Sequence, residues 1–182
     1  MSGEADTLRA YLRRGGLIAY PTESCYGLGC DPRNPRALKR LIRLKGRGGA
    51  KGLILVADHI KQLYPFIRPL SLADRARVQR SWPGPVTWVV PASRACLPLL
   101  TGGRTTIAVR VTAHPDAARL CRTLGSALVS TSANRSGRKP AQTGAQCRRM
   151  FGARVRVIDG RIGRRRRPST LIDLATGTVL RP

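Results

Sequence analysis

The sequence predicts a single α/β domain that spans residues 1–182, with a twisted mixed β-sheet flanked by helices. Short apolar runs of strand length alternate along the chain with longer amphipathic segments, a pattern typical of α/β folds. The final two runs lie on either side of 175–177, which predicts a terminal hairpin and therefore a sheet that is not purely parallel. With 182 residues, 42% of them hydrophobic, the chain is large enough for one core.

Proline and glycine bound most of the predicted strands. The first apolar run, 17–20, ends at Pro21 and the run 86–90 ends at Pro91, since proline cannot donate to a strand ladder. Residues 22–30, with three polar residues and two glycines, are predicted to be a loop, and 82–85 a rigid one. The predicted strands are 17–20, 53–57, 86–90, 105–111, 127–131, 155–158, 169–174 and 179–181.

Capping residues mark the predicted helices. Asn34 precedes Pro35, whose fixed φ and missing N–H suit the first helical position. Ser71 and Asp74 form a capping box, and Gly125 suits a helix end. The predicted helices are 4–14, 35 to about 44, 71–80, 114–124 and 142–151, with a helical turn at 59–63.

A basic, glycine-rich turn at 45–52 joins the second predicted helix to the strand at 53–57. Lysine, arginine and glycine are also common at ordinary helix ends, which is the simpler interpretation of the turn alone. Three cations, Lys45, Arg47 and Lys51, exceed what a helix end needs. Glycine lets backbone N–H groups approach phosphate, so the turn suits an anionic ligand, although its spacing is not that of a P-loop.

Net charge is the outstanding compositional feature. The chain has 34 Lys and Arg against 9 Asp and Glu, a net charge of +25. Such an excess predicts salt-dependent binding of a polyanion such as RNA, or it reflects the base composition of the genome. The run 164–167 contains four arginines and is predicted to be a solvated, mobile loop, with RNA contact as the alternative.

The sequence lacks the residue patterns that define several classes of enzyme and metal site. His59 and His114 precede helical segments, where capping or surface roles are expected, and no carboxylate pair or Gly-x-Ser-x-Gly motif is present. The five cysteines form no CxxC pair, which disfavours zinc and predicts reduced thiols. We expect no metal held by the protein. No apolar run is long enough for a membrane span and no signal region is evident, so a cytoplasmic location with no membrane partner is expected.

Groups that bind anions gather instead where predicted strands give way to loops, which is where open α/β sheets hold ligands. The segment 132–137 can also be an ordinary polar turn. Ser132 and Asn134 are two residues apart, so an extended backbone would aim both into one cleft. The candidates are Arg110, Ser132, Asn134, Ser169, Thr170, Arg181 and the basic turn.

The chain resembles the YrdC-like family, in its minimal single-domain form. The Lys-x-Arg and Ser-x-Asn elements together are specific to that family, and either alone is weak. The matching stretches occur in family order and cover almost the whole chain: 19–23, 26–31, 44–47, 51–55, 81–87, 108–112, 114–115, 128–134, 136–137 and 168–170.

This resemblance implies a basic concave face and the reaction of L-threonine, bicarbonate and ATP to threonylcarbamoyl-AMP and pyrophosphate. The product would serve N6-threonylcarbamoyladenosine formation next to the anticodon of tRNAs that read codons beginning with A. A downstream threonylcarbamoyl transferase complex and tRNA or RNA are the implied partners, and Mg²⁺ would enter with ATP. The resemblance implies catalytic roles for Lys45, Arg47, Ser132 and Asn134, ATP contacts for Arg47, Lys51, Thr106, Asn134 and Arg181, and threonine contacts for Ser24, Arg110, Ser132 and Ser169.

Three positions depart from the family's pattern. Gly48 and Gly52 stand where many relatives have proline, and Val56 replaces a polar residue of longer relatives. We expect Lys45 and Arg47 to face solvent in the cleft, and a mobile C-terminal segment is a candidate lid. Two alternatives remain: an RNA-binding module without catalysis, which the aromatic content of 4% disfavours, and a subunit that delivers carbamoyl-type groups within an assembly.

Overall fold

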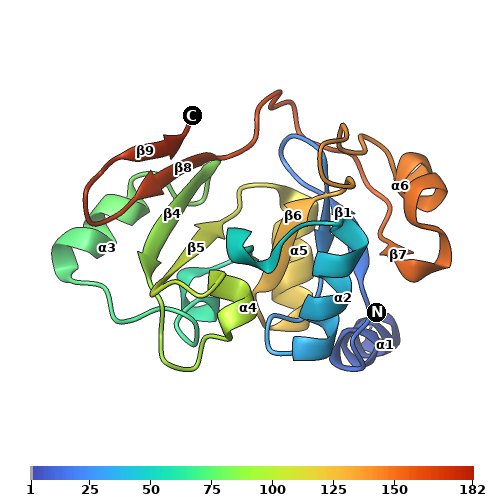
Figure 1. The fold of residues 1–182 in the computed structure, drawn as a ribbon, viewed down its shortest axis with the longest axis horizontal. Coiled ribbons are helices and arrows are strands. Elements are labelled where there is room, and N and C mark those ends of the chain that lie inside the picture. Colours follow the sequence, from blue (N-terminus) through green and yellow to red (C-terminus); the bar gives the residue numbers. More distant parts are fainter. Residues whose placement is uncertain (1) are drawn as a thin grey trace.

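The computed structural model describes residues 2–182, and it is an α/β domain built on one mixed sheet, as the sequence predicts. The nine strands lie in the order β7-β1-β2-β6-β3-β5-β4-β8-β9 (Figure 1). Their bounds are β1 Ile18–Pro21, β2 Tyr26–Gly29, β3 Ile54–Ala57, β4 Val86–Pro91, β5 Thr106–Val111, β6 Leu128–Ser132, β7 Arg156–Val157, β8 Thr170–Asp173 and β9 Val179–Arg181.

Parallel and antiparallel pairs alternate irregularly across this sheet. β3 pairs with β5 in parallel, as β4 does with β8 and β1 with β7. β6 is antiparallel to both of its neighbours, β2 and β3. Because β6 lies between β2 and β3, the loop that follows it emerges beside the starts of those two strands.

Helices cover both faces of the sheet. Three of the predicted caps are present: Asn34 accepts from Ala37 N, Ser71 from Asp74 N, and His114 from Ala117 N. The helices are α1 Ser2–Arg13, α2 Pro35–Lys45, α3 Leu72–Gln79, α4 Pro98–Thr101, α5 Pro115–Leu124 and α6 Gly144–Phe151, with 3₁₀ turns η1 Gly49–Lys51, η2 Ile60–Gln62 and η3 Gly152–Arg154.

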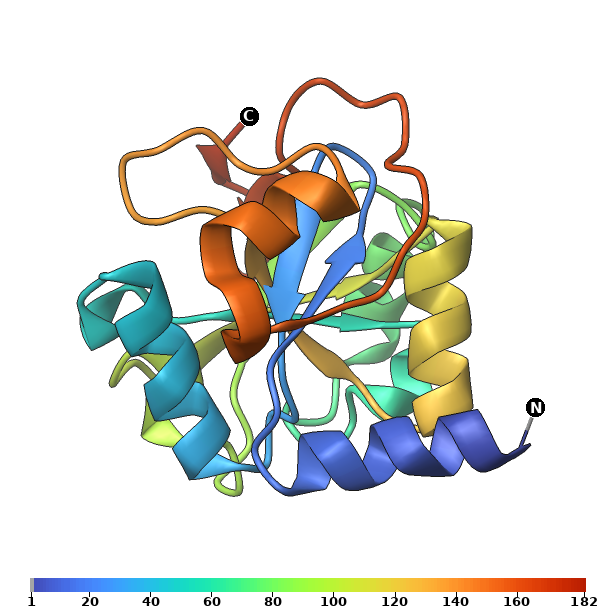
Figure 2. The same cartoon turned by 90° about the vertical axis from the view of Figure 1, so that its right-hand side faces the viewer.

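Two apolar clusters form the core. Leu8 and Leu12 of α1 pack with α5 against one face of β1, where Ile18 and Tyr20 are buried. The larger cluster includes the inner faces of α2 and α6 and most of the remaining strands. Figure 2 shows α2 and α5 on opposite sides of the strands, with α1 along the base. No helix among residues 2–182 is long and apolar enough to cross a membrane.

The predicted loop at 22–30 is wrong in its second half, which forms strand β2 between β1 and β6. Its glycines, which suggested a loop, allow close strand approach instead: a Cβ at Gly29 would lie 2.6 Å from Val129 O. The four-residue helix α4 was also not predicted, and α1 begins at Ser2 rather than at residue 4.

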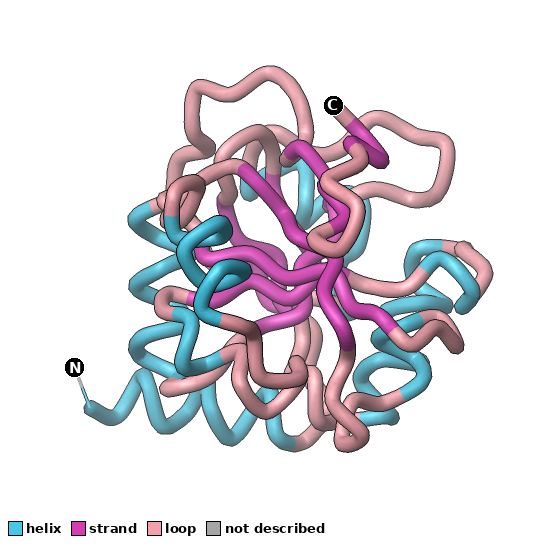
Figure 3. The backbone as a smooth tube through the Cα atoms, turned by 90° about the vertical axis from the view of Figure 1, so that its left-hand side faces the viewer, coloured by secondary structure: helices cyan, strands magenta, loops and turns pink. Residues whose placement is uncertain are grey.

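The segment 158–169 connects β7, at one edge of the sheet, to β8, near the other. It crosses the molecule at the end where the strand-connecting loops gather (Figures 1 and 3). Gly163 N donates to Thr22 O at 2.9 Å and Arg165 N to Glu23 O at 3.1 Å. The Arg165 guanidinium also donates to Thr170 Oγ1 at 3.2 Å. Arg165 is therefore held by contacts, unlike the fully solvated residue that the sequence predicted.

Candidate functional site

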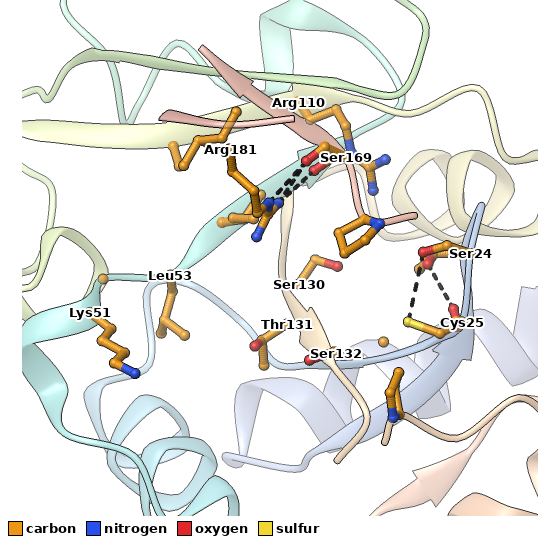
Figure 4. A pocket seen from close by; sticks show the side chains of 18 of the residues that line it. Ser24, Cys25, Lys51, Leu53, Arg110, Ser130, Thr131, Ser132, Ser169 and Arg181 are labelled. Carbon is orange, nitrogen blue, oxygen red and sulfur yellow. Dashed lines mark hydrogen bonds between the residues drawn. The ribbon is translucent and has the colours of Figure 1, made fainter. Parts of the chain in front are cut away.

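One cleft of about 800 Å³ opens at the loop-rich end of the sheet. Cations dominate its lining, with Glu23 and Asp173 as the two acids among the described lining residues. Figure 4 shows Arg110, Ser169 and Arg181 in one group, with Lys51 on a separate side. All ten residues named from the resemblance line it: Ser24, Lys45, Arg47, Lys51, Thr106, Arg110, Ser132, Asn134, Ser169 and Arg181.

Lys45 ends helix α2 and is buried, with 4% of its surface exposed, so the prediction that it faces solvent is wrong. Its Nζ donates to the carbonyl of Ser132, to Asn134 O at 3.0 Å and to Asn134 Oδ1 at 2.9 Å. These acceptors belong to the loop that leaves β6, and Ser136 N in turn donates to Lys45 O at 2.8 Å. The ammonium group thus organises the loop as well as facing the cleft.

Helix α2 ends here because Gly46 adopts a φ of 58°, the left-handed conformation that stops a helix and satisfies its last carbonyls. No carboxylate forms an ion pair with Lys45 in the described part of the chain. Burial, and then the positive charge of Arg47, lower the pKa of Lys45 to about 8. The protonated form of Lys45 is consequently less stable here than in water, and a bound anion would stabilise it.

Arg47, in the basic turn, lines the cleft and is half-buried, again less exposed than predicted. Its guanidinium donates to the carbonyl of Gly52 and, at 3.4 Å, to Thr131 Oγ1. Burial lowers its pKa from the usual value, but an arginine stays charged at any physiological pH. The basic turn therefore holds a second cation on fixed backbone and side-chain acceptors.

The three departures from the family's pattern have different structural settings. Gly52 has a φ of 59°, which proline cannot adopt, and a Cβ there would lie 3.1 Å from Thr101 O. Gly48 has open space around it, so nothing in the structure requires glycine there. Val56 is fully buried in β3 and is not among the residues that line the cleft.

The end of β6 brings Ser132 and Asn134 to Lys45, as their two-residue spacing predicts. Ser132 Oγ donates to Asn134 Oδ1 at 2.7 Å, the same oxygen that accepts from Lys45. Asn134 Nδ2 donates to the carbonyl of Arg138, which fixes the amide. Lys51, on η1, and Thr106, at the start of β5, complete this side of the cleft, and in the described structure neither side chain bonds to Lys45, Ser132 or Asn134. We call Lys45, Arg47, Lys51, Ser132 and Asn134 the Lys45 half.

The other side of the cleft carries a paired cation. Arg110, in β5, lies 2.9 Å from Glu23 Oε2 as an ion pair, and Thr112 Oγ1 donates to Glu23 Oε1 at 2.6 Å. Arg181 of β9 donates to Ser169 O at 2.8 Å and to its Oγ at 3.2 Å. We call Glu23, Arg110, Ser169 and Arg181 the Arg110 half. Burial, and then the charge of Arg110, lower the pKa of Arg181.

Ser24 and Cys25 lie between the two halves, on the loop after β1. Ser24 Oγ is 3.9 Å from Cys25 Sγ, and burial raises the pKa of this thiol, so Cys25 is a poor nucleophile. All five cysteines are free thiols, as predicted. No group of three His, Cys, Asp or Glu side chains suited to a metal occurs in the described residues.

Sequence reasoning missed several lining residues. Glu23 belongs to a stretch that matches the family, but an acid gave no reason to expect a place in a site for anions. Arg104 and Arg165 were hidden among the many arginines of a chain with net charge +25. For Cys25, the proximity to Ser24 within a predicted loop was the available signal. Thr170, named from its position, does not line the cleft and instead accepts from Arg165.

The comparisons with known proteins agree with this geometry. The model of the Sua5/YciO/YrdC family, described as telomere recombination, matches residues 10–182. A threonylcarbamoyl-AMP synthase of Thiobacillus denitrificans is 74% identical over 179 residues, which cover 98% of this chain and 95% of that protein. The corresponding protein of Methylobacillus flagellatus is 58% identical over 178 residues, 98% of this chain and 99% of that one.

Solved structures give the same result. P. abyssi Sua5 in complex with L-threonine superposes with a TM-score of 0.87 and 32% identity, over 96% of this chain and 52% of the Sua5 chain. This chain thus spans about half the length of that protein. E. coli YciO superposes with a TM-score of 0.83 and 25% identity, over 100% of this chain and 89% of YciO. The chain belongs to the Sua5/YciO/YrdC family.

Proposed function

We propose that the chain is a threonylcarbamoyl-AMP synthase, a nucleotidyltransferase that converts L-threonine, bicarbonate and ATP to threonylcarbamoyl-AMP and pyrophosphate. The strongest support is the 74% identity to the Thiobacillus denitrificans protein of that name across nearly the full length of both chains. The cleft adds a physical reason, because its cations and neutral donors suit a reaction between anions. These properties favour the enzyme over a carbamoyl-delivering subunit or a binding module.

In the reaction, the threonine amine first combines with bicarbonate to give N-carboxy-threonine and water. An oxygen of its N-carboxy group then attacks the α-phosphorus of ATP, and pyrophosphate leaves with the electrons of the broken P–O bond. Two anions must approach each other, so cations that neutralise both are the main requirement. Lys45 and Arg47 are held on fixed acceptors, which means that little reorganisation is needed when charge develops at the α-phosphate. Ser132 and Asn134 carry no charge and would orient the reacting groups.

We assign the substrates to the two halves of the cleft. The Lys45 half, whose cations lack carboxylate partners among residues 2–182, would receive the phosphates of ATP. Arg110 and Ser169 of the Arg110 half, together with Ser24 and with Ser132 at the end of β6, would receive threonine, in line with the roles that the resemblance implies. Arg181 is the exception in the Arg110 half: it and Thr106 would contact ATP from the side of β5 and β9.

Magnesium is proposed as part of the MgATP substrate. Glu23 is engaged by Arg110 and Thr112, and Asp173 Oδ1 accepts from Ala175 N at 2.9 Å and Thr176 N at 3.0 Å. Because these two acids of the cleft are occupied, phosphate oxygens and water would supply the Mg²⁺ ligands.

Pyrophosphate release is the test of the proposed function. The purified protein should release pyrophosphate from ATP when threonine and bicarbonate are both present, and each omission should abolish the release. Release that ignores threonine, or no release from folded protein, would contradict the proposal. An RNA-binding module without catalysis would bind RNA and give no pyrophosphate.

We also propose that the protein binds tRNA through its charge, in the cytoplasm, beside the threonylcarbamoyl transferase complex that consumes its product. The net charge of +25 supports this, since counterion release drives binding of polyanions. Affinity for unmodified tRNA should fall steeply between about 50 and 200 mM salt. Binding that does not change with salt would overturn this partner without affecting the proposed chemistry.

A further inference from the structure

Glu23 is out of place in a cleft that binds anions. It is one of two acids there, against eight cations: Lys45, Arg47, Lys51, Arg104, Arg110, Arg165, Arg166 and Arg181. Its side chain is only 14% exposed, and a buried carboxylate is costly unless it is paired and hydrogen-bonded. A negative charge at this position would also repel the threonine carboxylate. Its presence therefore calls for a compensating role.

The contacts of Glu23 indicate that role. Oε2 lies 2.9 Å from Arg110 Nη1, and Oε1 accepts from Thr112 Oγ1 at 2.6 Å. Burial alone would raise the pKa of Glu23, but the charge of Arg110 and the hydrogen bond from Thr112 outweigh it and lower the pKa. The group is therefore a carboxylate. Thr112 donates a hydrogen bond to one oxygen, and Arg110 holds the other, Oε2, as an ion pair without a hydrogen bond of favourable geometry.

Arg110 keeps binding capacity that Glu23 does not use. Its side chain is 8% exposed, and its Nε is buried without a hydrogen-bond partner among residues 2–182, although the residue lines the cleft. A guanidinium has five donors in a fixed planar fork, so a carboxylate that holds Nη1 determines where the other donors point. The buried Nε is out of reach of a ligand, so the Nη donors that Glu23 leaves free are the ones available to a substrate in the cleft.

The backbone of Glu23 is tied to a second wall of the cleft. Its carbonyl accepts from Arg165 N at 3.1 Å, and the neighbouring Thr22 carbonyl accepts from Gly163 N at 2.9 Å. These bonds hold the segment 163–169, which brings Ser169 to the Arg110 half. One residue thus links Arg110 on β5 with the segment that carries Ser169.

We propose that Glu23 is a positioning residue for amino-acid recognition: it fixes the Arg110 guanidinium so that its free donors receive the carboxylate of threonine. Glu23 itself does not touch the substrate. This inference rests on the proposed function and adds to it a residue to which nothing else assigns a role. It also explains the acid in the cleft, because orientation of Arg110 offsets the repulsion that the acid introduces.

Glu23→Gln tests the inference, because it keeps the shape and the acceptor for Thr112 but removes the charge. The Michaelis constant for threonine should rise at least tenfold, while that for ATP stays within about twofold. Threonine binding without ATP, measured by calorimetry, should weaken by a similar factor. Asp58→Asn is the matched control: it removes a carboxylate from the Asp58–Arg122 ion pair, 2.7 Å long and outside the cleft, and should leave both constants unchanged.

A double-mutant cycle separates positioning from a general structural effect. If Glu23 acts through Arg110, adding Glu23→Gln to Arg110→Ala should weaken threonine binding no further than Arg110→Ala alone. Glu23→Asp should recover part of the loss. Thr112→Val keeps the ion pair and should raise the threonine constant about threefold, which gives a readout if Glu23→Gln folds poorly. Additive losses, or equal losses for ATP and threonine, would overturn the role of Glu23.

The failure of this inference is distinguishable from failure of the proposed function. A wild-type protein that binds threonine and releases pyrophosphate, beside an unchanged Glu23→Gln variant, overturns only the role of Glu23. Tighter threonine binding in Glu23→Gln does the same, because it would show repulsion without positioning. A wild-type protein that binds no threonine overturns both.

Discussion

The two halves of the cleft use the same kind of residue in opposite ways. In the Lys45 half, the Lys45 ammonium is surrounded by neutral acceptors from the β6 loop, and its positive charge is not balanced. In the Arg110 half, the cation is paired with Glu23 at 2.9 Å and is close to neutral as a unit. The first arrangement maximises attraction for a polyanion such as a triphosphate. The second fixes a planar donor fork, which selects for the shape of a single carboxylate.

This contrast explains why the two cations need different supports. A buried cationic side chain without an acidic partner has a lowered pKa and attracts an anion strongly. Such a group needs only to be placed near the anion and does not need a fixed orientation. A cation that must distinguish one small ligand from others needs a fixed orientation, and an ion pair provides it. Four experiments test whether the two halves act on different substrates.

The largest effect is expected at Lys45 and Arg47. Lys45→Ala or Arg47→Ala should each reduce pyrophosphate formation about 100-fold, because an oriented charge at the α-phosphate is lost. Lys45→Ala should also unfold more easily, since the carbonyls of Ser132 and Asn134 lose their donor, whereas Arg47→Ala should keep wild-type stability within about 1 kcal/mol. Kinetics and thermal melts of both variants measure this. Wild-type turnover in folded protein would remove the basic turn from the mechanism.

A loss of about 30-fold in kcat/KM for threonine is expected for Arg110→Ala, with little change in the ATP constant. Arg110→Lys should recover little, because an ammonium group cannot pair with Glu23 and a substrate carboxylate through a planar fork. Steady-state kinetics with each substrate varied in turn measures this. Equal losses for both substrates would show that the two halves are not separate in function.

About a tenfold loss of kcat/KM for ATP is expected as the pH rises from 7 to 9. Lys45 has a pKa of about 8 in the folded protein, below its usual 10.5, so its charge is present below pH 8 and is lost above it. For the same reason the unfolded chain binds more protons between these values, and the contribution of Lys45 to stability rises with pH there. A pH–rate profile that is unchanged in Lys45→Arg would assign the decline to another group.

The smallest effect is expected at Ser132 and Asn134, about fivefold for each alanine variant, or roughly 1 kcal/mol for one hydrogen bond. Loss of Ser132 should act mainly on threonine use and loss of Asn134 on ATP use. Because Ser132 Oγ donates to the Asn134 oxygen that binds Lys45, the double variant should lose less than the product of the two. Independent, multiplicative losses would show that the shared oxygen is unimportant.

Much of the fold could be predicted because it depends on local patterns, whereas the full set of site residues was predicted from the family resemblance. A few consecutive residues are enough to identify helix caps such as Asn34 and His114, and apolar runs that end at a proline. Strand β2 was missed because its Gly29 is required by the close approach of Val129, a residue 100 positions away along the chain. The burial of Lys45 and the pairing of Glu23 with Arg110 also depend on contacts between segments that are far apart in the sequence, so no local pattern predicts them.

The crossing of segment 158–169 from β7 to β8 gives the protein a built-in proteolytic reporter. This segment contains the four consecutive arginines 164–167, of which all but Arg167, which precedes Pro168, are potential trypsin sites, yet the backbone at Arg165 is bonded to Glu23 on the opposite wall. A protease needs an extended, detached backbone, so cleavage there requires the segment to lift from the loop after β1. The rate of cutting would therefore measure how often the two edges of the sheet are uncoupled, in the free protein and in the presence of each substrate.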